Sequence, residues 1–551
     1  MTSTRDSKAK EEKRVLAEHC SIDSNNSSID VEKETDVASI SWRYKIPILI
    51  VLLLLNLGPH VAEATLSPLK TTIKENVKEH GEKICNARYG VISSASALIN
   101  ALFPIISGVL IDFYGPSFVS LTCSTITFVG YIVRAVGGQR ESFSIILGGE
   151  ILSGFGFITL NSCKYKLYTH WFSGSVKSGP GHIAFIIGLD IAMNRVYNTI
   201  GKQSAIPIVE DAGEANWYWA LWFGAILTGF SLIINVAYVI MERRLPSALR
   251  VKTGYEIASE RCKTLQNVNK HWAILQMLKE QLKQVVYIIR DLPAAYWLIC
   301  CTQILQSASI DAYSSNSPEL IQNTRGEDKR VAAAEGGLDD VIPIVLTPVF
   351  GFLIDRYGGR TYYIVYTACV YLIAFSLLAY TKVNALAPVL LASLALSSND
   401  LPFEVTIPLV VRTKTSLGTA FGGWKAFYKA GTVILDVSTG AIQNHSVAVK
   451  HVSPEHQFDD MFYFLIAIKC VDVINGCMYM YVDKHYMGHV MTLSERGRVT
   501  KEANEESRKK DRKLLKPRLR WTIVGICMYF ALVITAYVIF IYYSVAKETC
   551  R

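Results

Sequence analysis

Long apolar blocks separated by short polar stretches fill most of the chain after residue 42. Each block has about 18 or more mostly apolar residues, the length that an α-helix needs to cross the hydrocarbon core of a bilayer. The pattern predicts thirteen membrane-spanning helices, so the expected fold class is an all-α membrane protein. The expected spans are residues 46–66, 89–111, 117–137, 143–168, 181–206, 216–241, 293–313, 331–354, 361–380, 386–411, 416–442, 459–482 and 519–546.

The composition agrees with a membrane protein and excludes several other classes. Of the 551 residues, 50% are hydrophobic and only 19% are charged, whereas about 25% is usual for a soluble domain. Disordered chains, secreted disulfide scaffolds and soluble enzymes therefore fit poorly. The 12 cysteines form no C-x-x-C pair and lie mostly within apolar blocks. We therefore expect neither a metal site nor a disulfide framework.

The sequence also lacks the common motifs of catalysis and cofactor binding. It contains no G-x-x-x-x-G-K-[ST] phosphate loop, no H-E-x-x-H zinc motif and no G-x-S-x-G nucleophile turn. We therefore expect no enzymatic activity, no cofactor and no direct use of ATP.

The formal net charge of +9 is concentrated in two polar links, residues 242–290 and 484–518. Basic loops stay on the cytoplasmic side of a membrane, so we expect both links and the N-terminus to be cytoplasmic. A nucleic-acid partner is not expected, because it would need a basic patch on one folded face. The expected organisation is a disordered tail (1–42), a first six-helix half (43–241), the first link (242–290), a second half (291–483), the second link (484–518) and an additional helix (519–546).

A short motif occurs twice, once after the second predicted span and once after the eighth. Residues 108–115 read Gly-Val-Leu-Ile-Asp-Phe-Tyr-Gly, and residues 351–358 read Gly-Phe-Leu-Ile-Asp-Arg-Tyr-Gly. Glycine lets two helices approach closely, and an aspartate at a helix C-terminus needs a cation or the N-terminus of another helix. We therefore expect a latch between helices at each copy. The candidate gating residues are Gly108, Asp112, Gly115, Gly351, Asp355, Arg356, Gly358 and Arg360.

Two copies in corresponding positions indicate two related halves. The motif resembles the loop signature of the major facilitator superfamily, and the resemblance covers roughly residues 43–483. It implies two pseudo-symmetric six-helix bundles that move a solute by alternating access, with 519–546 as an extra transmembrane helix. In the first copy, Phe113 and Pro116 stand where the family usually has basic residues. We therefore expect the weaker latch in the first half.

Residues 89–115, 154–201 and 417–422 resemble a branch of this superfamily whose members export dipeptides from lysosomes. The resemblance implies a vacuolar or lysosomal membrane and a glycosylated single-span accessory protein as partner. An acidic residue in the fourth span of that branch holds the peptide amino group, and this position is Ile158 here. An arginine of the fifth span matches Arg195. The missing carboxylate at Ile158 brings the dipeptide substrate into question.

Charged residues within the predicted spans are the candidates for substrate binding, because a charge at membrane depth costs at least ~2.5 kcal/mol on insertion scales. Arg195 in the fifth span and Lys429 in the eleventh are expected to hold a substrate carboxylate, and Lys425 lies on the same helical stripe as Lys429. Glu404 and Asp400 in the tenth span are the expected acceptors for a substrate amine.

Three further residues are candidates for proton coupling. His60 and Glu63 share a face of the first span, and Asp190 lies in the fifth. The structural alternative is that His60 and Glu63 are hydrated at the far interface of the membrane. For Arg195, the structural alternative is an ion pair with Asp190 or Glu150.

These features predict a secondary active or facilitative transporter of small solutes, with dipeptides or similar zwitterions as the leading substrate class. An organic-anion or monocarboxylate porter is the alternative carrier, favoured by the cations and by Ile158. A transport-silent receptor or scaffold is the alternative from another class, suggested by the tails and the added span. The expected partners are the small-molecule substrate and the bilayer, and a plasma-membrane location is the alternative to the vacuole or lysosome.

Overall fold

The computed structural model describes residues 41–79, 82–83, 86–174, 180–246, 249–251, 253, 289–290, 292–327, 329–411, 416–448, 456, 458–504 and 518–545. Residues 1–40 of the predicted tail (1–42), most of the first basic link (242–290) and residues 505–517 of the second link (484–518) fall outside these ranges. Their predicted conformations therefore stay predictions.

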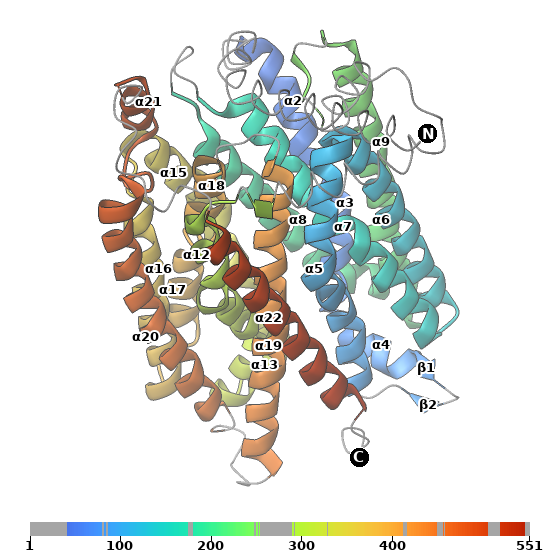
Figure 1. The fold of residues 1–551 in the computed structure, drawn as a ribbon. Helices are drawn as coiled ribbons and strands as arrows, with labels where there is room; N and C mark the ends of the chain where they lie inside the picture. The colour runs from blue at the N-terminus through green and yellow to red at the C-terminus, as the bar shows by residue number, and fades with distance from the viewer. Residues whose placement is uncertain are drawn as a thin grey trace, which may run out of the picture.

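The first half of the chain forms a bundle of long helices, blue to green in Figure 1. Within the described residues, two strands of two residues each, β1 (Lys78–Glu79) and β2 (Glu82–Lys83), pair in an antiparallel hairpin. The helices are α2 (Trp42–Leu54), α3 (Leu57–Ala64), α4 (Lys70–Asn76), α5 (Asn86–Tyr114), α6 (Pro116–Gln139), α7 (Phe143–Phe172), α8 (Ile183–Ala212), the short η3 (Glu214–Asn216) and α9 (Trp219–Arg244).

The second half forms a neighbouring bundle, yellow to red in Figure 1. It contains α12 (Ala294–Cys301), the π-helical turn η5 (Ile304–Ala308), α13 (Ser309–Arg325), α14 (Lys329–Gly336), η6 (Gly337–Asp340), α15 (Val341–Tyr357), α16 (Arg360–Tyr380), α17 (Leu386–Leu396), α18 (Leu401–Val410), α19 (Leu417–Ala448), α20 (Asp459–Val482), η9 (Asp483–Met487), α21 (Glu495–Asn504) and α22 (Leu519–Val545).

Helices form at all thirteen predicted places, as an all-α membrane fold requires. Within the described residues, ten helical segments are long and apolar enough to cross a membrane by length and composition. They include Leu519–Tyr542 of α22, the predicted thirteenth span. The fifth, seventh and eleventh predicted spans form α8, α12–α13 and α19, which carry more polar residues.

Some predicted spans are interrupted where polar side chains enter the bundle. The first divides into α2 and α3 at Asn56, whose side-chain amide donates to Asn161 of α7. The seventh is broken by the π-helical turn η5, and the tenth divides into α17 and α18 just before Pro402. Proline cannot donate a backbone hydrogen bond, so it is tolerated at a helix start. Such breaks turn backbone and side-chain polar groups inward, where a solute can meet them.

The additional helix α22 lies across the junction between the two halves (Figure 1). The Tyr529 hydroxyl donates to the carbonyl of Ala101 in α5 at 2.7 Å. Its ring packs on Phe427 of α19, with centroids 5.3 Å apart. Gly525 faces the ring of Trp297 in α12, and a Cβ there would overlap that ring. Helix α22 therefore contacts helices of both halves.

Candidate functional site

Both copies of the repeated motif fold into the same tight turn between consecutive helices. Gly115 joins α5 to α6 with a φ of +90°, and Gly358 follows α15 with a φ of +76°. L-residues with a side chain rarely adopt these angles, which explains why glycine closes each motif. The next residue in the second copy, Gly359, also has a positive φ, of +74°.

Asp112 of the first copy caps the N-terminus of a helix of the opposite half. Its Oδ1 accepts from the backbone N–H of Gly418 at 2.8 Å, and its Oδ2 accepts from the N–H and the hydroxyl of Thr419, both at 2.7 Å. These are the first orphan donors of α19, where the helix dipole favours a negative charge. Lys166 of α7 adds an ion pair to Oδ1 at 2.6 Å.

Asp355 makes the equivalent contact in the second copy. Its carboxylate accepts from the backbone N–H groups of Ala184, at 3.2 Å, and Phe185, at 2.9 Å, in the first turn of α8. No Lys or Arg of the described residues lies within ion-pair distance of Asp355. We expected the weaker latch in the first half, but the described contacts of Asp112 are the more numerous. Lys166 supplies a cation from α7 that the motif itself lacks.

The motif glycines allow the helices of opposite halves to touch. A Cβ on Gly108 of α5 would lie 2.8 Å from the Cα of Thr419, and a Cβ on Gly422 of α19 would overlap the carbonyl oxygen of Pro104. In the second copy, a Cβ on Gly351 of α15 would overlap the carbonyl oxygen of Ala184. The contacts α5–α19 and α15–α8 therefore close one end of the junction between the halves. This end, which contains Asp112 and Asp355, is the latched end of the molecule.

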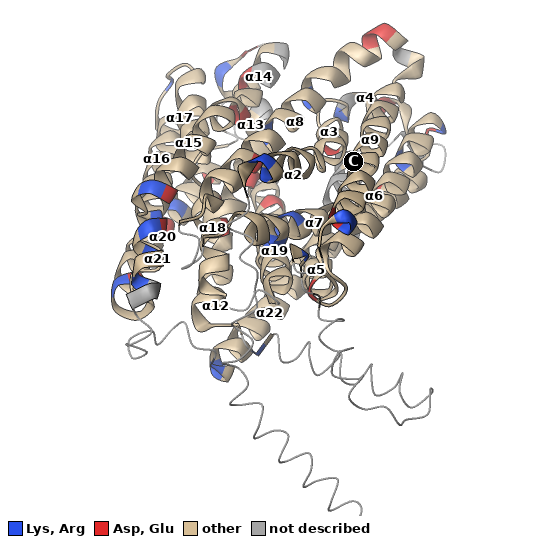
Figure 2. Cartoon of the chain, turned by 90° about the horizontal axis from the view of Figure 1, so that it is seen from above, with Lys and Arg blue, Asp and Glu red and all other residues tan. Residues whose placement is uncertain are grey.

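The segment after α20 covers the same end of the molecule. The buried guanidinium of Arg360 donates to the carbonyl of Leu493 at 3.0 Å. Glu495, the first residue of α21, pairs with Arg498 at 2.6 Å. Arg498 reaches the carbonyl of Gly174 in the first half at 3.4 Å. Figure 2 looks down on this end and shows the Lys and Arg residues of α21. Arg356, by contrast, is exposed, with its guanidinium 5.5 Å from the centre of the Tyr357 ring.

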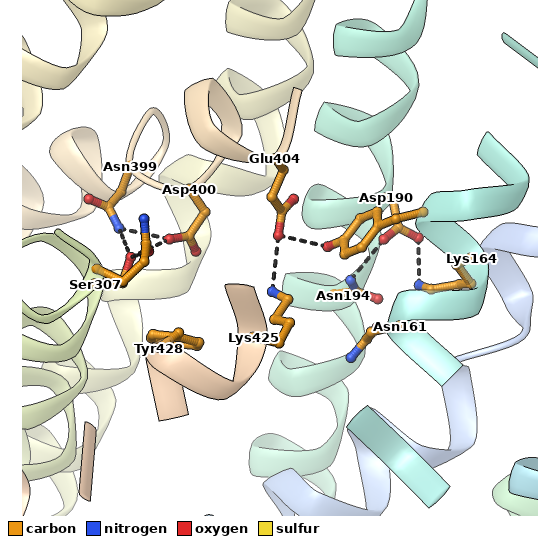
Figure 3. Close-up of polar contacts among 12 residues, drawn as sticks. Asn161, Lys164, Asp190, Asn194, Ser307, Asn399, Asp400, Glu404, Lys425 and Tyr428 are labelled. Atoms are coloured by element: carbon orange, nitrogen blue, oxygen red, sulfur yellow. Dashed lines mark hydrogen bonds and ion pairs between the residues drawn. The ribbon is translucent and has the colours of Figure 1, made fainter. Parts of the chain in front are cut away.

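A row of polar side chains crosses the molecule from one half to the other (Figure 3). At its centre, Glu404 of α18 accepts from Lys425 of α19 at 3.0 Å and from the hydroxyl of Tyr165 of α7 at 2.9 Å. The Lys425 ammonium also lies 4.4 Å from the ring centre of Trp424. Two predicted substrate residues, Glu404 and Lys425, therefore neutralise each other.

Asp190 lies on the first-half side of this row. It accepts from Lys164 at 2.7 Å, from the hydroxyl of Tyr168 at 2.8 Å and from Asn194 at 3.2 Å. The Asp190 and Lys164 side chains have no exposed surface. The role of Asp190 in proton coupling stays a prediction.

Arg195 pairs across the junction with Asp340 of η6, at 2.7 Å, and Lys202 of α8 binds the other oxygen of Asp340 at 2.7 Å. The structural alternative that we considered for Arg195 was therefore wrong, because Asp190 is held by Lys164. Glu150 likewise forms an ion pair with another residue, Arg134, at 2.7 Å.

Asp400 occupies the break between α17 and α18. It accepts from the hydroxyl of Ser307 at 2.8 Å and from the side-chain amide of Asn399 at 2.9 Å. These partners are neutral, and no Lys or Arg of the described residues pairs with Asp400. Its negative charge is therefore hydrogen-bonded but not neutralised.

Lys429 and Asp311 are also left without a partner of opposite charge among the described residues. The Lys429 ammonium lies 4.9 Å from the centre of the Tyr428 ring. The Tyr428 hydroxyl donates to Asp311 of α13 at 2.5 Å, and Thr432 donates to the same oxygen at 3.1 Å. Tyr428 therefore contacts an unpaired cation and an unpaired carboxylate. Figure 3 shows Tyr428 and Asp400 on the same side of the Glu404–Lys425 pair.

His60 and Glu63 lie on α3, next to the break in the first span. His60 Nδ1 lies 3.2 Å from the side-chain oxygen of Asn198, and its ring meets Phe157 edge-on at 4.9 Å. Glu63 is exposed. Whether either group carries protons stays a prediction.

Exposure to solvent rises along α8 away from the latches. The side chain of Asp190 is fully buried, that of Arg195 is 24% exposed and that of Lys202 is 37% exposed. Asp112 at the latched end has no exposed side-chain surface. The side chains of α8 therefore become more exposed with distance from the latches, while the contacts at the latches are buried.

Sequence reasoning missed several residues of this site. Asp340 lies within the predicted eighth span, where it ends η6, and Asp311 lies near the end of the seventh. Both are carboxylates within or beside an apolar block, which was the signal available. Ser307 and Tyr428 offered no such signal, because Ser and Tyr are ordinary in membrane helices.

Comparison with known proteins places the chain in a family. A family model described as Major Facilitator Superfamily matches residues 52–435. The human "Lysosomal dipeptide transporter MFSD1" is 20% identical over 407 residues, which cover 72% of this chain and 80% of that protein. The same-named mouse protein is 20% identical over 409 residues, with the same coverage of both chains.

Solved structures of low sequence identity share the fold. A double Trp mutant of XylE is similar with a TM-score of 0.57 at 13% identity, covering 80% of this chain and 95% of that one. The human organic anion transporter MFSD10 (TETRAN) is similar with a TM-score of 0.51 at 15% identity, covering 78% and 98%. Because the family model spans more than half of its length, this chain belongs to the major facilitator superfamily of membrane transporters.

Proposed function

We propose that the chain is a carrier that moves small zwitterions, dipeptides above all, by alternating access between its two halves. The observation that carries this proposal is a set of three charges near Tyr428 that lack a partner of opposite charge. Lys429 offers an ammonium, Asp311 and Asp400 offer carboxylates, and none of these three has a partner of opposite charge among the described residues. A charge at membrane depth is costly unless it is paired. A zwitterion satisfies both signs at once.

In this arrangement the substrate carboxylate binds Lys429, and the substrate ammonium lies between Asp311 and Asp400. The carboxylate that the related branch has in its fourth span is Ile158 here. Asp311 and Asp400, on the second half, take over its role in holding the amine. The similarity to the lysosomal dipeptide transporters supports the same substrate class.

An organic-anion porter fits less well. Such a porter needs an excess of cations at its site. Among the described residues, Arg195 and Lys202 are held by Asp340, and Lys425 is held by Glu404. Lys429 has no such partner, and neither have the carboxylates Asp311 and Asp400. The balance of charge therefore favours a substrate that carries both signs.

The membrane and the orientation belong to the same proposal. The related proteins are named as lysosomal, and we place the chain in a vacuolar or lysosomal membrane with its N-terminus and the latched end in the cytoplasm. The opposite end, where Arg195 and Lys202 are partly exposed, then faces the lumen, from which dipeptides would enter. The single-span accessory protein stays a prediction from the resemblance.

The test is uptake by the full chain in proteoliposomes, with and without a pH gradient. The substrates are a labelled neutral dipeptide, its N-acetyl derivative, its C-terminal amide and a monocarboxylate. We expect saturable uptake of the free dipeptide and at least about tenfold weaker uptake of both blocked forms, since each loses a charge-assisted contact. Stimulation by an acidic lumen would indicate proton coupling.

Variants of single residues test which side chains bind the carboxylate of the substrate and which bind its amine. Lys429→Gln should remove the preference for the free carboxylate, and Asp311→Asn or Asp400→Asn should reduce the preference for the free amine. Lys484→Gln, at an exposed lysine after α20, is the matched control and should behave like the unchanged protein. Uptake of the monocarboxylate at the same rate as the dipeptide would support the anion porter instead. Uptake of none of these compounds would reject the proposal.

A further inference from the structure

A buried lysine that forms an ion pair with neither Asp400 nor Asp311 contacts the part of the chain that presents them. Lys469 of α20 has no exposed side-chain surface. Its ammonium donates to the carbonyls of Leu305, at 3.2 Å, and Gln306, at 2.9 Å, and pairs with Asp472 at 3.2 Å. These contacts use all three donors of the ammonium.

Leu305 and Gln306 belong to η5, the π-helical turn that separates α12 from α13. A π-helical turn holds one residue more than an α-helical turn, is rare, and occurs frequently at functional sites. Two of its carbonyl oxygens are bound by a cation from another helix. The Lys469 ammonium therefore stabilises the irregular turn in preference to a regular helix.

The turn sets the direction of two groups at the candidate site. Ser307, the fourth residue of η5, donates to Asp400 at 2.8 Å and accepts from Asn399 at 3.1 Å. Asp311 lies in the first turn of α13, directly after η5. In an α-helix each residue turns the chain by about 100°. Removal of the extra residue from the turn would therefore rotate Ser307 away from Asp400 and change the direction of Asp311.

We propose that Lys469 is a positioning residue for the amine-binding end of the transport site, acting through η5 on Asp400 and Asp311. This proposal rests on the proposed function, because it assigns the amine to those two carboxylates. Lys469 does not touch the substrate. Its removal should therefore reduce the recognition of a free amino group more than it reduces transport in general.

The test measures uptake of a free dipeptide and of its N-acetyl form by the full chain in proteoliposomes. Lys469→Met alone leaves Asp472 buried without its cation, which is costly and can prevent folding. The double variant Lys469→Met/Asp472→Met removes both charges and is the main variant. We expect the preference for the free amine to fall about tenfold, with uptake of the N-acetyl dipeptide unchanged.

Ser307→Ala removes the hydrogen bond from η5 to Asp400 while Lys469 stays in place. It should also lower the preference for the free amine. Hydrogen exchange of the peptide that covers η5 is a second measurement. It should be changed in the double variant and unchanged in Ser307→Ala. Lys484→Gln should alter neither measurement.

The results separate the two proposals. If the unchanged protein takes up neither compound, or does not distinguish them, the proposed function fails and this assignment fails with it. If the unchanged protein prefers the free amine and the folded double variant keeps the same preference, the proposed function stands and the positioning role of Lys469 is wrong. Equal loss of uptake for both compounds would also overturn the positioning role, because it indicates a purely structural one.

Discussion

Asp112 and Thr419 connect the two halves of the protein through a single carboxylate oxygen. Asp112 Oδ2 accepts from both the backbone N–H and the hydroxyl of Thr419 at 2.7 Å. Because the two residues belong to α5 and α19, this contact exists only while the latched end is closed. The aspartate of a turn motif in one half thus serves as the helix cap of the other half.

Asp112→Ala should favour opening of the latched end. The substitution removes charge-assisted hydrogen bonds to the first turn of α19 and leaves Lys166 buried without its carboxylate. Such bonds contribute about 1.5–3 kcal/mol each. Alkylation of a cysteine placed at the buried Ala420, in a background without reactive cysteines, should become at least about tenfold faster. Asp211→Asn, at the exposed end of α8, is the control. An unchanged rate in Asp112→Ala would show that the latch does not hold this end closed.

Gly422→Ala should prevent the close contact of α19 with α5. Its Cβ would overlap the carbonyl oxygen of Pro104, whereas a Cβ on Gly440 of the same helix meets nothing within 4 Å. Gly440→Ala should be neutral or stabilising by about 1 kcal/mol, because alanine is the better helix former. Thermal unfolding in detergent and alkylation at Ala420 compare the two variants. Similar behaviour of both would contradict the tight packing at Gly422.

Asp340→Asn should impair the protein more than Lys202→Gln does. Asp340→Asn leaves both Arg195 and Lys202 without a carboxylate, while Lys202 is 37% exposed and can be hydrated. Breaking a buried pair costs about 3–5 kcal/mol, and an exposed pair is worth about 0–1 kcal/mol. Thermal stability and dipeptide uptake should both fall in Asp340→Asn and change little in Lys202→Gln. An effect of Lys202→Gln as strong as that of Asp340→Asn would contradict this prediction, because it would leave no part of the loss to the Arg195–Asp340 pair.

Docking of α21 should depend on pH through Glu495. Burial alone would raise the pKa of Glu495, but the guanidinium groups of Arg498 and Arg360 hold that pKa below its usual value. A carboxyl group with a lowered pKa stabilises the docked state above its usual pKa, and this stabilisation is lost as the pH falls through the lowered value. Glu495→Gln should therefore release α21 at neutral pH.

Limited proteolysis of residues 495–504 at neutral pH measures that release. Cleavage should be faster in Glu495→Gln than in the unchanged protein. Lys484→Gln, outside the Glu495–Arg498 pair, should be cleaved at the unchanged rate. Equal cleavage of Glu495→Gln and the unchanged protein would exclude Glu495 as the residue that holds α21.

The sequence predicted the helices well because the bilayer imposes a length and an apolar composition on each span. It also predicted the repeated turns, since Gly115 and Gly358 occupy a backbone conformation that favours glycine. Which charged residues form ion pairs with each other was harder to predict. Arg195 binds Asp340, which lies far away in the sequence, and Lys166 completes the first latch from α7. Such contacts depend on how the helices pack, and periodicity along one helix carries no information about that. The π-helical turn at η5 was missed for the same reason.

A carrier that moves zwitterions by alternating access should exchange dipeptides across the membrane, and counterflow measures this exchange. Proteoliposomes that contain the full chain are loaded with an unlabelled neutral dipeptide, and the entry of the labelled dipeptide is followed without any ion gradient. Loading should accelerate entry of the label, and Lys429→Gln should abolish the acceleration, while Lys484→Gln should retain it. Entry at the same rate into loaded and empty vesicles would show that the chain does not carry this zwitterion by alternating access.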